Sequence, residues 1–475
     1  MTTALFNDFL PITKADWQAQ ATKDLKGKDL EQTLNWQTTE GFELEAYYTE
    51  DNLNHQKVAA IQASQRYQGG WLNQCVVKYT NEKNTNIQII NILQKGADSV
   101  MLDLSEINCT QINFSKLLHN IRLSDTSLTF KTNNQADILI CELQKFINYK
   151  IKGGLADDGL VKFMTTGRLA DNYFETCADV LKKTQDSPQF KTICVDGQIF
   201  QNAGGNAVQE LAFMLASAIT YLDKLTDLGL SPDEVFSKIY FSVSVGTNYF
   251  MEIAKLRALR YLWGIVISRE SWVMGQNLEI NKLSSLLTTH DPRLTTISAT
   301  TSPYYDAAVT PYTNLIRATT EAMSAVMGGC DALTVRPFDD VYQASSEFSE
   351  RVARNLSVIL SQEAHLDKTA DPSAGSYYIE KLTVELAEAA WDLFLETESL
   401  GGLIPAFEQN FIQNKIEKNI HSITQQLNNL TLVGVNKYRF DETPFVKPIT
   451  KSTIKNLDIS FKLLVNKRLS ESFES

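Results

Sequence analysis

The segment that would carry proton-transfer chemistry in this chain spans residues 192–205 and reads TICVDGQIFQNAGG. A short run of β-forming residues leads into a turn, and an apolar helical pattern follows. A general acid or base at such a point would be His, Asp, Glu or Lys. Asp196 is the one such residue in the segment, and Gln198 and Ile199 follow it. Because an isoleucine cannot transfer a proton, the segment predicts a site that has lost acid–base catalysis.

The ends of the other predicted strands carry few charged groups. Asp306, Arg336 and Asp339 are the residues there that are able to bind a ligand. A surface position or an ion pair is the favoured interpretation for each, since one carboxylate per loop is a weak signal. The glycine pair at 204–205 opens a helix, where an anion can bind. No basic residue accompanies the pair, so tight packing is the preferred interpretation.

Metal-binding and nucleotide-binding motifs are absent from the sequence. The five histidines are His55, His119, His290, His365 and His421, and none has HxxxH, HExxH or Cys/His spacing. The six cysteines are scattered without a CxxC pair, so reduced, mostly buried thiols are expected. The chain has no GxSxG elbow, no P-loop and no GxGxxG after a strand. We therefore predict no metal site.

Composition favours an ordinary globular protein. The 475 residues are 43% hydrophobic, and the net charge of −12 comes from interspersed acidic and basic residues. This pattern argues against a nucleic-acid partner. The N-terminus lacks the basic and apolar regions of a signal peptide, and no segment approaches the ~20 apolar residues that span a bilayer. We expect a cytoplasmic protein without a membrane association.

The pattern of strands and helices predicts a TIM barrel. Strands are expected at 72–79, 99–104, 191–196, 239–245, 294–299 and 331–336. Helices are expected near 85–94, 172–184, 206–226, 248–267 and 311–327. Strands that alternate with helices of this length form parallel sheets. Residues 105–170 leave room for two further units, so a closed eight-stranded α/β barrel is favoured over an open sheet.

The helix at 311–327 shows how the fold is encoded. Thr310 provides an N-cap and Pro311 the first helical residue, and two glycines follow the last turn. An apolar stripe is expected to face the barrel: Leu315, Ile316, Ala322, Met323, Val326 and Met327. Arg317 and Glu321 are expected to form an exposed ion pair on the opposite face.

Three regions are predicted along the chain. Residues 1–54 form an N-terminal arm, residues 55–400 the barrel, and residues 401–475 a C-terminal helical segment with a tail. The arm is rich in aromatic residues between charges, so it either caps its own barrel or embraces another subunit. An interface is the working prediction. The tail from residue 436 is rich in Lys and Thr and is expected to be loosely attached.

Six segments, taken together, resemble methylmalonyl-CoA mutase and occur in that family's order between about residues 190 and 440. They are NYFMEIAKLRALRYLW (248–263), TPYTNLIRATTEAMSAVMGG (310–329), RVARNLSVIL (351–360), DPSAGSYYIEKLT (371–383), ETESLGG (396–402) and GVNKYR (434–439). Weaker similarity extends over 17–30, 38–49 and 96–104. The resemblance implies a TIM barrel threaded by CoA, and a flavodoxin-like domain that binds adenosylcobalamin through a DxHxxG motif.

The chain departs from the family pattern at the residues that implement the reaction. No histidine has an Asp two positions before it, so DxHxxG is absent. Catalytic members have Gly-Tyr-His where this chain has Gly197, Gln198 and Ile199. The family's His-Ser-Gln is matched by Ser298, Ala299 and Thr300, and its Thr-Ser-Gly-Trp ends here in Tyr304. The resemblance therefore implies no catalytic residue and no bound cofactor in this chain.

These losses resemble the small (β) subunit of heterodimeric bacterial methylmalonyl-CoA mutases. That resemblance implies a partner, the catalytic large (α) subunit, which would bind adenosylcobalamin and interconvert methylmalonyl-CoA and succinyl-CoA. Two alternatives stay open: a barrel that acts on or binds another acyl-CoA, and a mutase-related interaction protein that assembles with a different partner.

Overall fold

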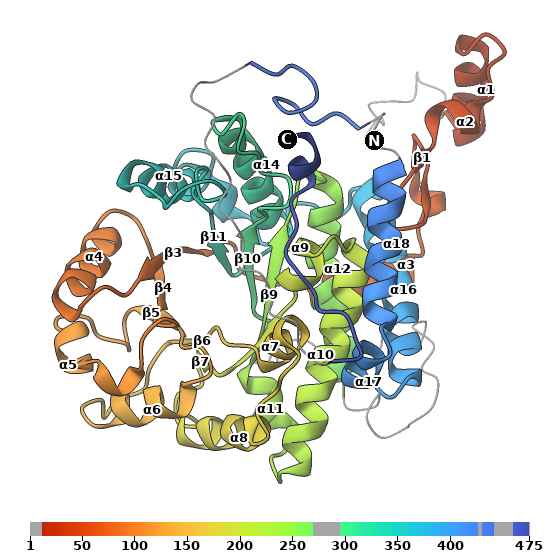
Figure 1. Cartoon of the computed structure of the whole chain (residues 1–475). Helices are drawn as coiled ribbons and strands as arrows, with labels where there is room; N and C mark the ends of the chain where they lie inside the picture. The colour runs from red at the N-terminus through yellow and green to blue at the C-terminus, as the bar shows by residue number, and fades with distance from the viewer. Residues whose placement is uncertain (1–11, 269–294, 426–429, 441–458, 475) are drawn as a thin grey trace, which may run out of the picture.

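A ring of parallel strands forms the centre of the molecule (Figure 1). The computed structural model describes residues 12–268, 295–425, 430–440 and 459–474. The strands of the ring are β3 (Leu72–Lys78), β4 (Ser99–Asp103), β5 (Ser127–Lys131), β6 (Gly153–Leu155), β7 (Phe190–Lys191), β8 (Ile193–Asp196), β9 (Ile239–Val245), β10 (Ile297–Thr301) and β11 (Ala332–Thr334). All neighbouring pairs are parallel.

The ring closes through β7 and β8, which are two parts of one strand separated by Thr192. β7 pairs with β6, whereas β8 pairs with β9. The nine segments therefore make eight strands, and the sheet is a (β/α)8 barrel. This confirms the predicted TIM barrel, and β5 and β6 are the two units expected within residues 105–170.

Most predicted strand boundaries agree with the structure to within two residues. The strand predicted at 294–299 lies later, at Ile297–Thr301, because its ladder with β9 continues to the pair Thr301 and Val245. Residue 294 lies outside the described residues.

Helices surround the barrel (Figure 1). The longer ones are α4 (Glu82–Gln94), α6 (Ala136–Gln144), α8 (Tyr173–Lys183), α10 (Ala207–Asp227), α12 (Tyr249–Ile267), α14 (Thr313–Met327) and α15 (Glu347–Gln362). Shorter ones are α5 (Phe114–Leu117), α7 (Gly159–Thr166), α9 (Gln198–Asn202) and α11 (Pro232–Lys238). None of the helices among the described residues is long and apolar enough to cross a membrane.

β9 shows which side chains line the barrel and which face the helices. Phe241, Val243 and Val245 are fully buried in the hydrophobic core around the ring. The alternate residues Tyr240 and Ser242 point inward and line the interior. The sequence IYFSVSV thus encodes an apolar outer face and a polar inner face.

The barrel has two hydrophobic cores. Strands β3–β7 share one core with the helices beside them, and Phe130 and Phe190 belong to it. Strands β8–β11 belong to the other core, which contains Val195 and Leu333. The boundary on one side is Thr192, between β7 and β8. On the other side it is the short ladder between β11 and β3, which pairs two residues of each strand.

Three C-terminal helices pack beside α10 and α12: α16 (Tyr377–Ser399), α17 (Leu403–Glu408) and α18 (Phe411–Gln425) (Figure 1). The helical segment predicted within residues 401–475 is interrupted between α17 and α18. Asn410 has a φ of 60°, a left-handed conformation that Asn tolerates better than most residues.

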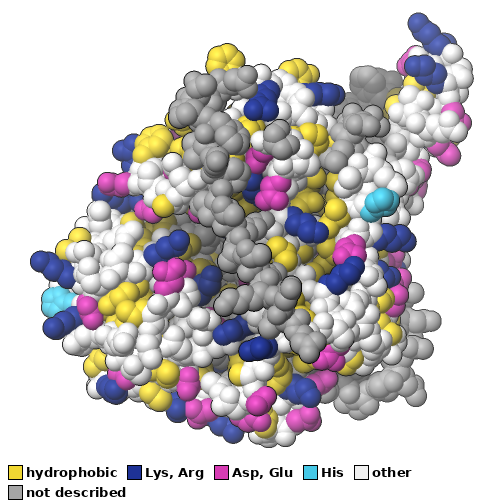
Figure 2. Space-filling view, viewed as in Figure 1, with side chains coloured by type: hydrophobic (Ala, Val, Ile, Leu, Met, Phe, Trp, Pro, Cys, Tyr) yellow, Lys and Arg dark blue, Asp and Glu magenta, His cyan; other side chains and the backbone are white. Residues whose placement is uncertain are grey.

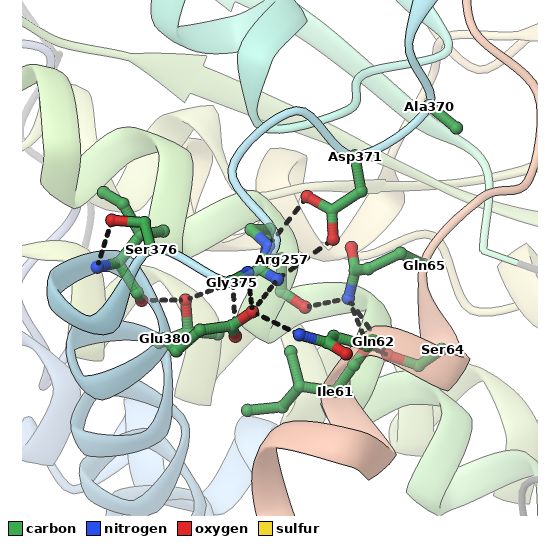
Figure 3. Close-up of polar contacts among 12 residues, drawn as sticks. Ile61, Gln62, Ser64, Gln65, Arg257, Ala370, Asp371, Gly375, Ser376 and Glu380 are labelled. Atoms are coloured by element: carbon green, nitrogen blue, oxygen red, sulfur yellow. Dashed lines mark hydrogen bonds and ion pairs between the residues drawn. The ribbon is translucent and has the colours of Figure 1, made fainter. Parts of the chain in front are cut away.

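A buried ion cluster attaches α16 to the barrel helices (Figure 3). Arg257 of α12 donates Nε and Nη2 to the carboxylate of Asp371, at 3.1 and 3.0 Å, and Nη1 and Nη2 to Glu380, at 3.0 and 3.1 Å. Nη1 also donates to Thr383 Oγ1. Gln62, on α3 (His55–Ser64), donates to Glu380 as well. The side chains of Arg257 and Glu380 are fully buried, so both charges depend on these partners.

The prediction of a loosely attached tail is wrong for residues 459–474, which we call the strap. Leu464, Arg468 and Ser470 of the strap are buried. The strap runs in front of α9 and ends near α14 (Figure 1). Sequence composition did not reveal this attachment, because it depends on a few long-range contacts.

The N-terminal arm projects away from the barrel (Figure 1). It consists of α1 (Lys14–Asp24), α2 (Leu30–Leu34) and a hairpin of β1 (Trp36–Gln37) and β2 (Glu43–Leu44). Neither α1 nor α2 has a buried residue. The rings of Trp17 and Tyr47 stack with their centroids 5.0 Å apart.

Candidate functional site

Barrel enzymes keep their chemistry at the carboxyl ends of the strands. In this chain we call that region the rim, and it comprises the loops that begin after Lys78, Asp103, Lys131, Leu155, Asp196, Val245, Thr301 and Thr334. We call the space inside the ring the bore.

The turn after β8 holds the first two predicted site residues. Gln198 begins the short helix α9, and its Nε2 donates a hydrogen bond of 2.7 Å to Ser242 Oγ. Ile199 is 6% exposed and belongs to the hydrophobic core. The position at which the family resemblance places a proton donor is therefore a packing position in this chain.

The remaining predicted residues are divided between different environments. Ser298 of β10 lines the bore, as does Gln198. Ala299, the next residue, is fully buried in the outer core, and Thr300 lies opposite Ser244 and Thr334 in the ladder. Tyr304 is 6% exposed in the loop after β10 and contacts the ring of Tyr305. The structure thus brings Gln198 and Ser298 to one cavity, and places Ile199, Ala299 and Tyr304 elsewhere.

The bore contains a polar cavity of about 170 Å³. Its polar lining includes Gln74, Ser99, Ser127, Thr129, Lys131, Lys191, Asp196, Gln198, Ser242, Thr296, Ser298 and Asp331. Lys131 and Asp196 lie at the carboxyl ends of their strands, whereas Ser127 and Asp331 lie at or before the amino ends. The cavity therefore extends along the barrel axis.

Gln74 bridges strands across this cavity. Its Nε2 donates to Ser99 Oγ at 3.2 Å and to Thr129 Oγ1 at 3.3 Å. Its Oε1 accepts a bond of 3.1 Å from Thr334 Oγ1. The buried amide of one residue is thus hydrogen-bonded to three other strands along the wall of the bore. Sequence reasoning missed Gln74, since it lies within a strand and not at its end.

Asp196 is the acidic residue of the bore that lies at the carboxyl end of a strand. Burial raises its pKa, whereas bonds from the Gln198 backbone and Ser242 act in the opposite direction. Its own backbone N–H donates to Asp158 Oδ2 at 2.9 Å. Asp158 is the buried N-cap of α7, and burial raises its pKa to about 6 despite its bond from Tyr221. These partners fix the two carboxyl groups in structural roles.

A buried charge cluster lies behind the rim, between α10 and α12. Lys255 Nζ is 2.6 Å from Glu210 Oε2, 2.5 Å from Glu252 Oε2 and 2.6 Å from the carbonyl oxygen of Ser244. Burial raises the pKa of Glu210 to about 7. Sequence reasoning missed this cluster, although charged residues inside otherwise apolar helical faces are the available signal.

The charged residues predicted at the other strand ends have structural partners. Arg336 forms an ion pair of 2.5 Å with Asp340, which confirms the salt-bridge interpretation. Asp339 is 1% exposed, and its Oδ2 accepts a hydrogen bond of 3.1 Å from Nε2 of Gln343. Asp306 is buried, and burial raises its pKa to about 7.

The glycine pair is a packing site, as the sequence suggested. Gly204 has a φ of 106°, and a Cβ there would lie 2.5 Å from Ile420 Cγ1.

The predicted exposed pair of Arg317 and Glu321 is wrong. α14 begins at Thr313, and Glu321 is 1% exposed because it faces the barrel. Its Oε2 accepts a bond of 3.2 Å from the backbone N–H of Ser302. Ile316, expected in the core, is 68% exposed. Local spacing did not identify the buried face, since a rim N–H from a distant segment partners the carboxylate.

We expect Glu321→Gln to stabilise the protein by about 1–2 kcal/mol at pH 8. Burial raises the pKa of Glu321 well above its usual value, and Oε1 has no partner among the described residues. Because the pKa of Glu321 is higher in the folded state than in the unfolded state, the stability of the wild type falls as pH rises above the pKa of the unfolded state. Thermal unfolding at pH 5 and pH 8 measures the effect. A variant less stable than wild type at pH 8 would contradict the prediction.

The described residues contain no group of three or more His, Cys, Asp and Glu side chains able to hold a metal ion. All six cysteines are free thiols, and Cys109, Cys194 and Cys330 are buried.

Comparison with known proteins identifies a family. The sequence model of a family described as methylmalonyl-CoA mutase matches residues 107–460. This range covers strands β5 to β11 and the C-terminal helices.

Individual relatives have the same name. The chain is 34% identical over 428 residues to a methylmalonyl-CoA mutase small subunit of Porphyromonas gingivalis, covering 87% of this chain and 67% of the relative. It is 30% identical over 475 residues to a methylmalonyl-CoA mutase of Rhizobium meliloti, covering 90% and 64%. A small subunit from Streptomyces virginiae is 30% identical over 355 residues, covering 73% and 55%. The chain thus spans at most about two thirds of the length of these relatives.

Proposed function

The chain belongs to the methylmalonyl-CoA mutase family, and we propose that it is the non-catalytic small subunit of an adenosylcobalamin-dependent methylmalonyl-CoA mutase. The complex would interconvert methylmalonyl-CoA and succinyl-CoA. In this proposal the large subunit binds the cofactor and performs the reaction, and this chain stabilises it in a heterodimer.

The observation that carries the proposal is the packing of Ile199. A catalytic barrel would present a proton donor after β8, whereas this chain buries an aliphatic side chain there. The neighbouring Gln198 is hydrogen-bonded to Ser242. Asp196, the one acidic residue of this segment, accepts a hydrogen bond from the backbone N–H of Gln198, so the turn itself holds its carboxylate.

The bore supports the same proposal. CoA is a long molecule, and the resemblance implies that it would thread the barrel axis. In this chain the buried Gln74 amide lines the bore and is hydrogen-bonded to Ser99, Thr129 and Thr334. A ligand that displaced this amide would leave these polar groups without partners, at a cost of about 1–3 kcal/mol for each group.

The residues of this chain do not fit adenosylcobalamin. The four histidines among the described residues are all exposed, and no histidine in the whole sequence follows an Asp by two positions. We therefore derive no step through the cofactor in this chain and assign its binding to the large subunit.

The N-terminal arm is the surface that we assign to the large subunit. α1 and α2 have no buried residue, whereas Leu44 of the hairpin belongs to the barrel core, so the helical part of the arm is the exposed part. Trp36 is 50% exposed, and the stacked Trp17 and Tyr47 border a hollow of about 290 Å³. Exposed aromatic residues of this kind are enriched at protein interfaces.

The charge pattern of the surface bears on the kind of partner. On the face in Figure 2, the described basic and acidic side chains are interspersed, without a continuous basic region. This distribution fits a protein partner better than a nucleic acid.

Purification of this chain alone, the large subunit alone and the mixture tests the proposal. We expect the mixture to form a 1:1 complex with mutase activity, and the lone chain to show neither activity nor a cobalamin absorption spectrum. Calorimetry with CoA should give no binding to the lone chain. Turnover or bound cobalamin in the lone chain would overturn the proposal. Turnover of another acyl-CoA by the lone chain would instead support a barrel with a re-evolved site.

A further inference from the structure

The strap is anchored to the barrel at both of its ends. At the first anchor, the ring of Phe461 lies 5.5 Å from the rings of both Phe163 and Phe407, centroid to centroid. The backbone N–H of Leu464 donates to the carbonyl oxygen of Met164 at 2.9 Å. This anchor joins the strap to α7 and α17.

The second anchor is Arg468, which is 9% exposed. Its Nη1 donates to the carbonyl oxygen of Asp306 at 3.1 Å, and its Nη2 donates to Glu474 Oε2 at 2.8 Å. Glu474 Oε1 in turn accepts a bond of 2.7 Å from the backbone N–H of Ala308. Ser470 Oγ also donates to the carbonyl oxygen of Asp306. One buried guanidinium thus links the strap to the loop after β10.

On both sides of Arg468 the strap backbone contacts the rim. The N–H of Lys467 donates to the carbonyl oxygen of Asn202, and that of Leu469 to Tyr304, both at 2.7 Å. Asn202 ends α9, the helix that contains Ile199, and Tyr304 lies in the loop after β10. The same few strap residues therefore connect the two rim segments that contain three of the six substituted family positions, Gln198, Ile199 and Tyr304.

The strap also completes a small hydrophobic cluster. Leu469 and Phe473 pack against the buried side chains of Ala307, Val309, Leu432 and Val435. This cluster is separate from the two barrel cores, so its burial depends on the strap remaining in place.

We infer that the strap is a lid locked closed by Arg468, which holds α9 and the loop after β10 together without a ligand. Barrel enzymes leave the rim open to reactants, whereas this chain covers part of it with its own C-terminal segment. The strap excludes other chains from the carbonyl groups of Met164, Asn202 and Tyr304, and opening the Arg468 latch exposes them. This inference goes beyond the proposed function, because it concerns the lone chain and not its partner.

Hydrogen exchange of the full chain tests the latch. Arg468→Met removes the bonds to Asp306 and Glu474, and a hydrogen bond to a charged group is worth about 1.5–3 kcal/mol, or roughly 10- to 100-fold in an opening equilibrium. We expect at least tenfold faster exchange in the strap, in residues 198–206 and in residues 302–310. The peptides of α12 should exchange as in the wild type.

Lys462→Met is the matched control. Lys462 also lies in the strap and pairs with Glu417, but both side chains are about half exposed, so exchange should stay unchanged. Glu474→Gln, which keeps the shape of the latch, should accelerate the same segments less than Arg468→Met. Unchanged exchange in Arg468→Met, or equal acceleration in α12, would overturn the inference. The measurement needs no partner or activity, so its failure is distinguishable from failure of the proposed function.

Discussion

Replacing Arg257 by methionine should lower the free energy of unfolding by about 3–5 kcal/mol. The substitution keeps an apolar stem of similar length but leaves the buried Glu380 carboxylate without its cation. Asp371 loses its bidentate partner as well. The loop that contains Asp371 would then lose its main attachment to α12. Urea unfolding at pH 7, followed by circular dichroism, measures the change.

Two further variants make this result specific. Arg257→Lys should recover part of the loss, because an ammonium group restores the charge but not the planar set of five donors. Lys381→Met, on the same helix α16, removes a partly exposed pair with Glu385 and should change stability by less than about 1 kcal/mol. A loss as small for Arg257→Met as for Lys381→Met would show that the cluster does not stabilise the fold.

The second large effect is expected for Lys255→Met. Glu210 and Glu252 would remain behind the rim without the ammonium group that lies within 2.6 Å of each. We expect a loss of about 3–5 kcal/mol at pH 8, since removing one partner leaves uncompensated buried charges.

The loss should depend on pH in a defined direction. Burial raises the pKa of Glu210 from an ordinary 4.5 to about 7, and Lys255 acts to lower it. Without Lys255 the folded pKa rises further, so the folded state binds more protons than the unfolded state over a wider range. Stability should therefore fall as pH rises above about 4.5, and the fall should continue to higher pH than in the wild type.

Unfolding curves for Lys255→Met at pH 5, 6, 7 and 8 measure this slope. Lys183→Met, which removes a partly exposed pair with Asp179, is the control and should follow the wild-type pH dependence. A loss in Lys255→Met that is equal at pH 5 and pH 8 would contradict the role assigned to the two glutamates.

The barrel itself was predictable because its signal is repeated. Each unit has a β-rich run followed by a helix, and an error of two residues in one unit does not change the topology. The split strand at Thr192 was not predictable, since it depends on which neighbour each half-strand pairs with. The attachment of the strap was missed for the same reason. It depends on contacts of Phe461, Leu464 and Arg468 with distant segments, whereas the composition of the tail suggested loose attachment.

The candidate site was predicted in part. Strand-end reasoning located Gln198 and Ile199, and the structure shows the first in the bore and the second in the core. Glu321 was assigned to the exposed face of its helix, because a carboxylate is expected to face solvent unless a buried partner is known. Its partner, the backbone N–H of Ser302, lies in another segment. Gln74 escaped notice because a glutamine within a strand has no local signature. Buried polar contacts between distant segments are therefore the features of the site that could not be predicted from a single sequence.

The division of the barrel into two cores has a mechanical consequence. Each half keeps its own apolar packing, so the ring has two seams, one at Thr192 and one between β3 and β11. Gln74, on β3, is hydrogen-bonded to Thr334 on β11 and to Thr129 on β5. Its side chain therefore links β3 and β11 from within the bore. On this side the two halves of the barrel are therefore joined by a two-residue backbone ladder and one side-chain amide, whereas on the other side they are joined by the continuous chain through Thr192.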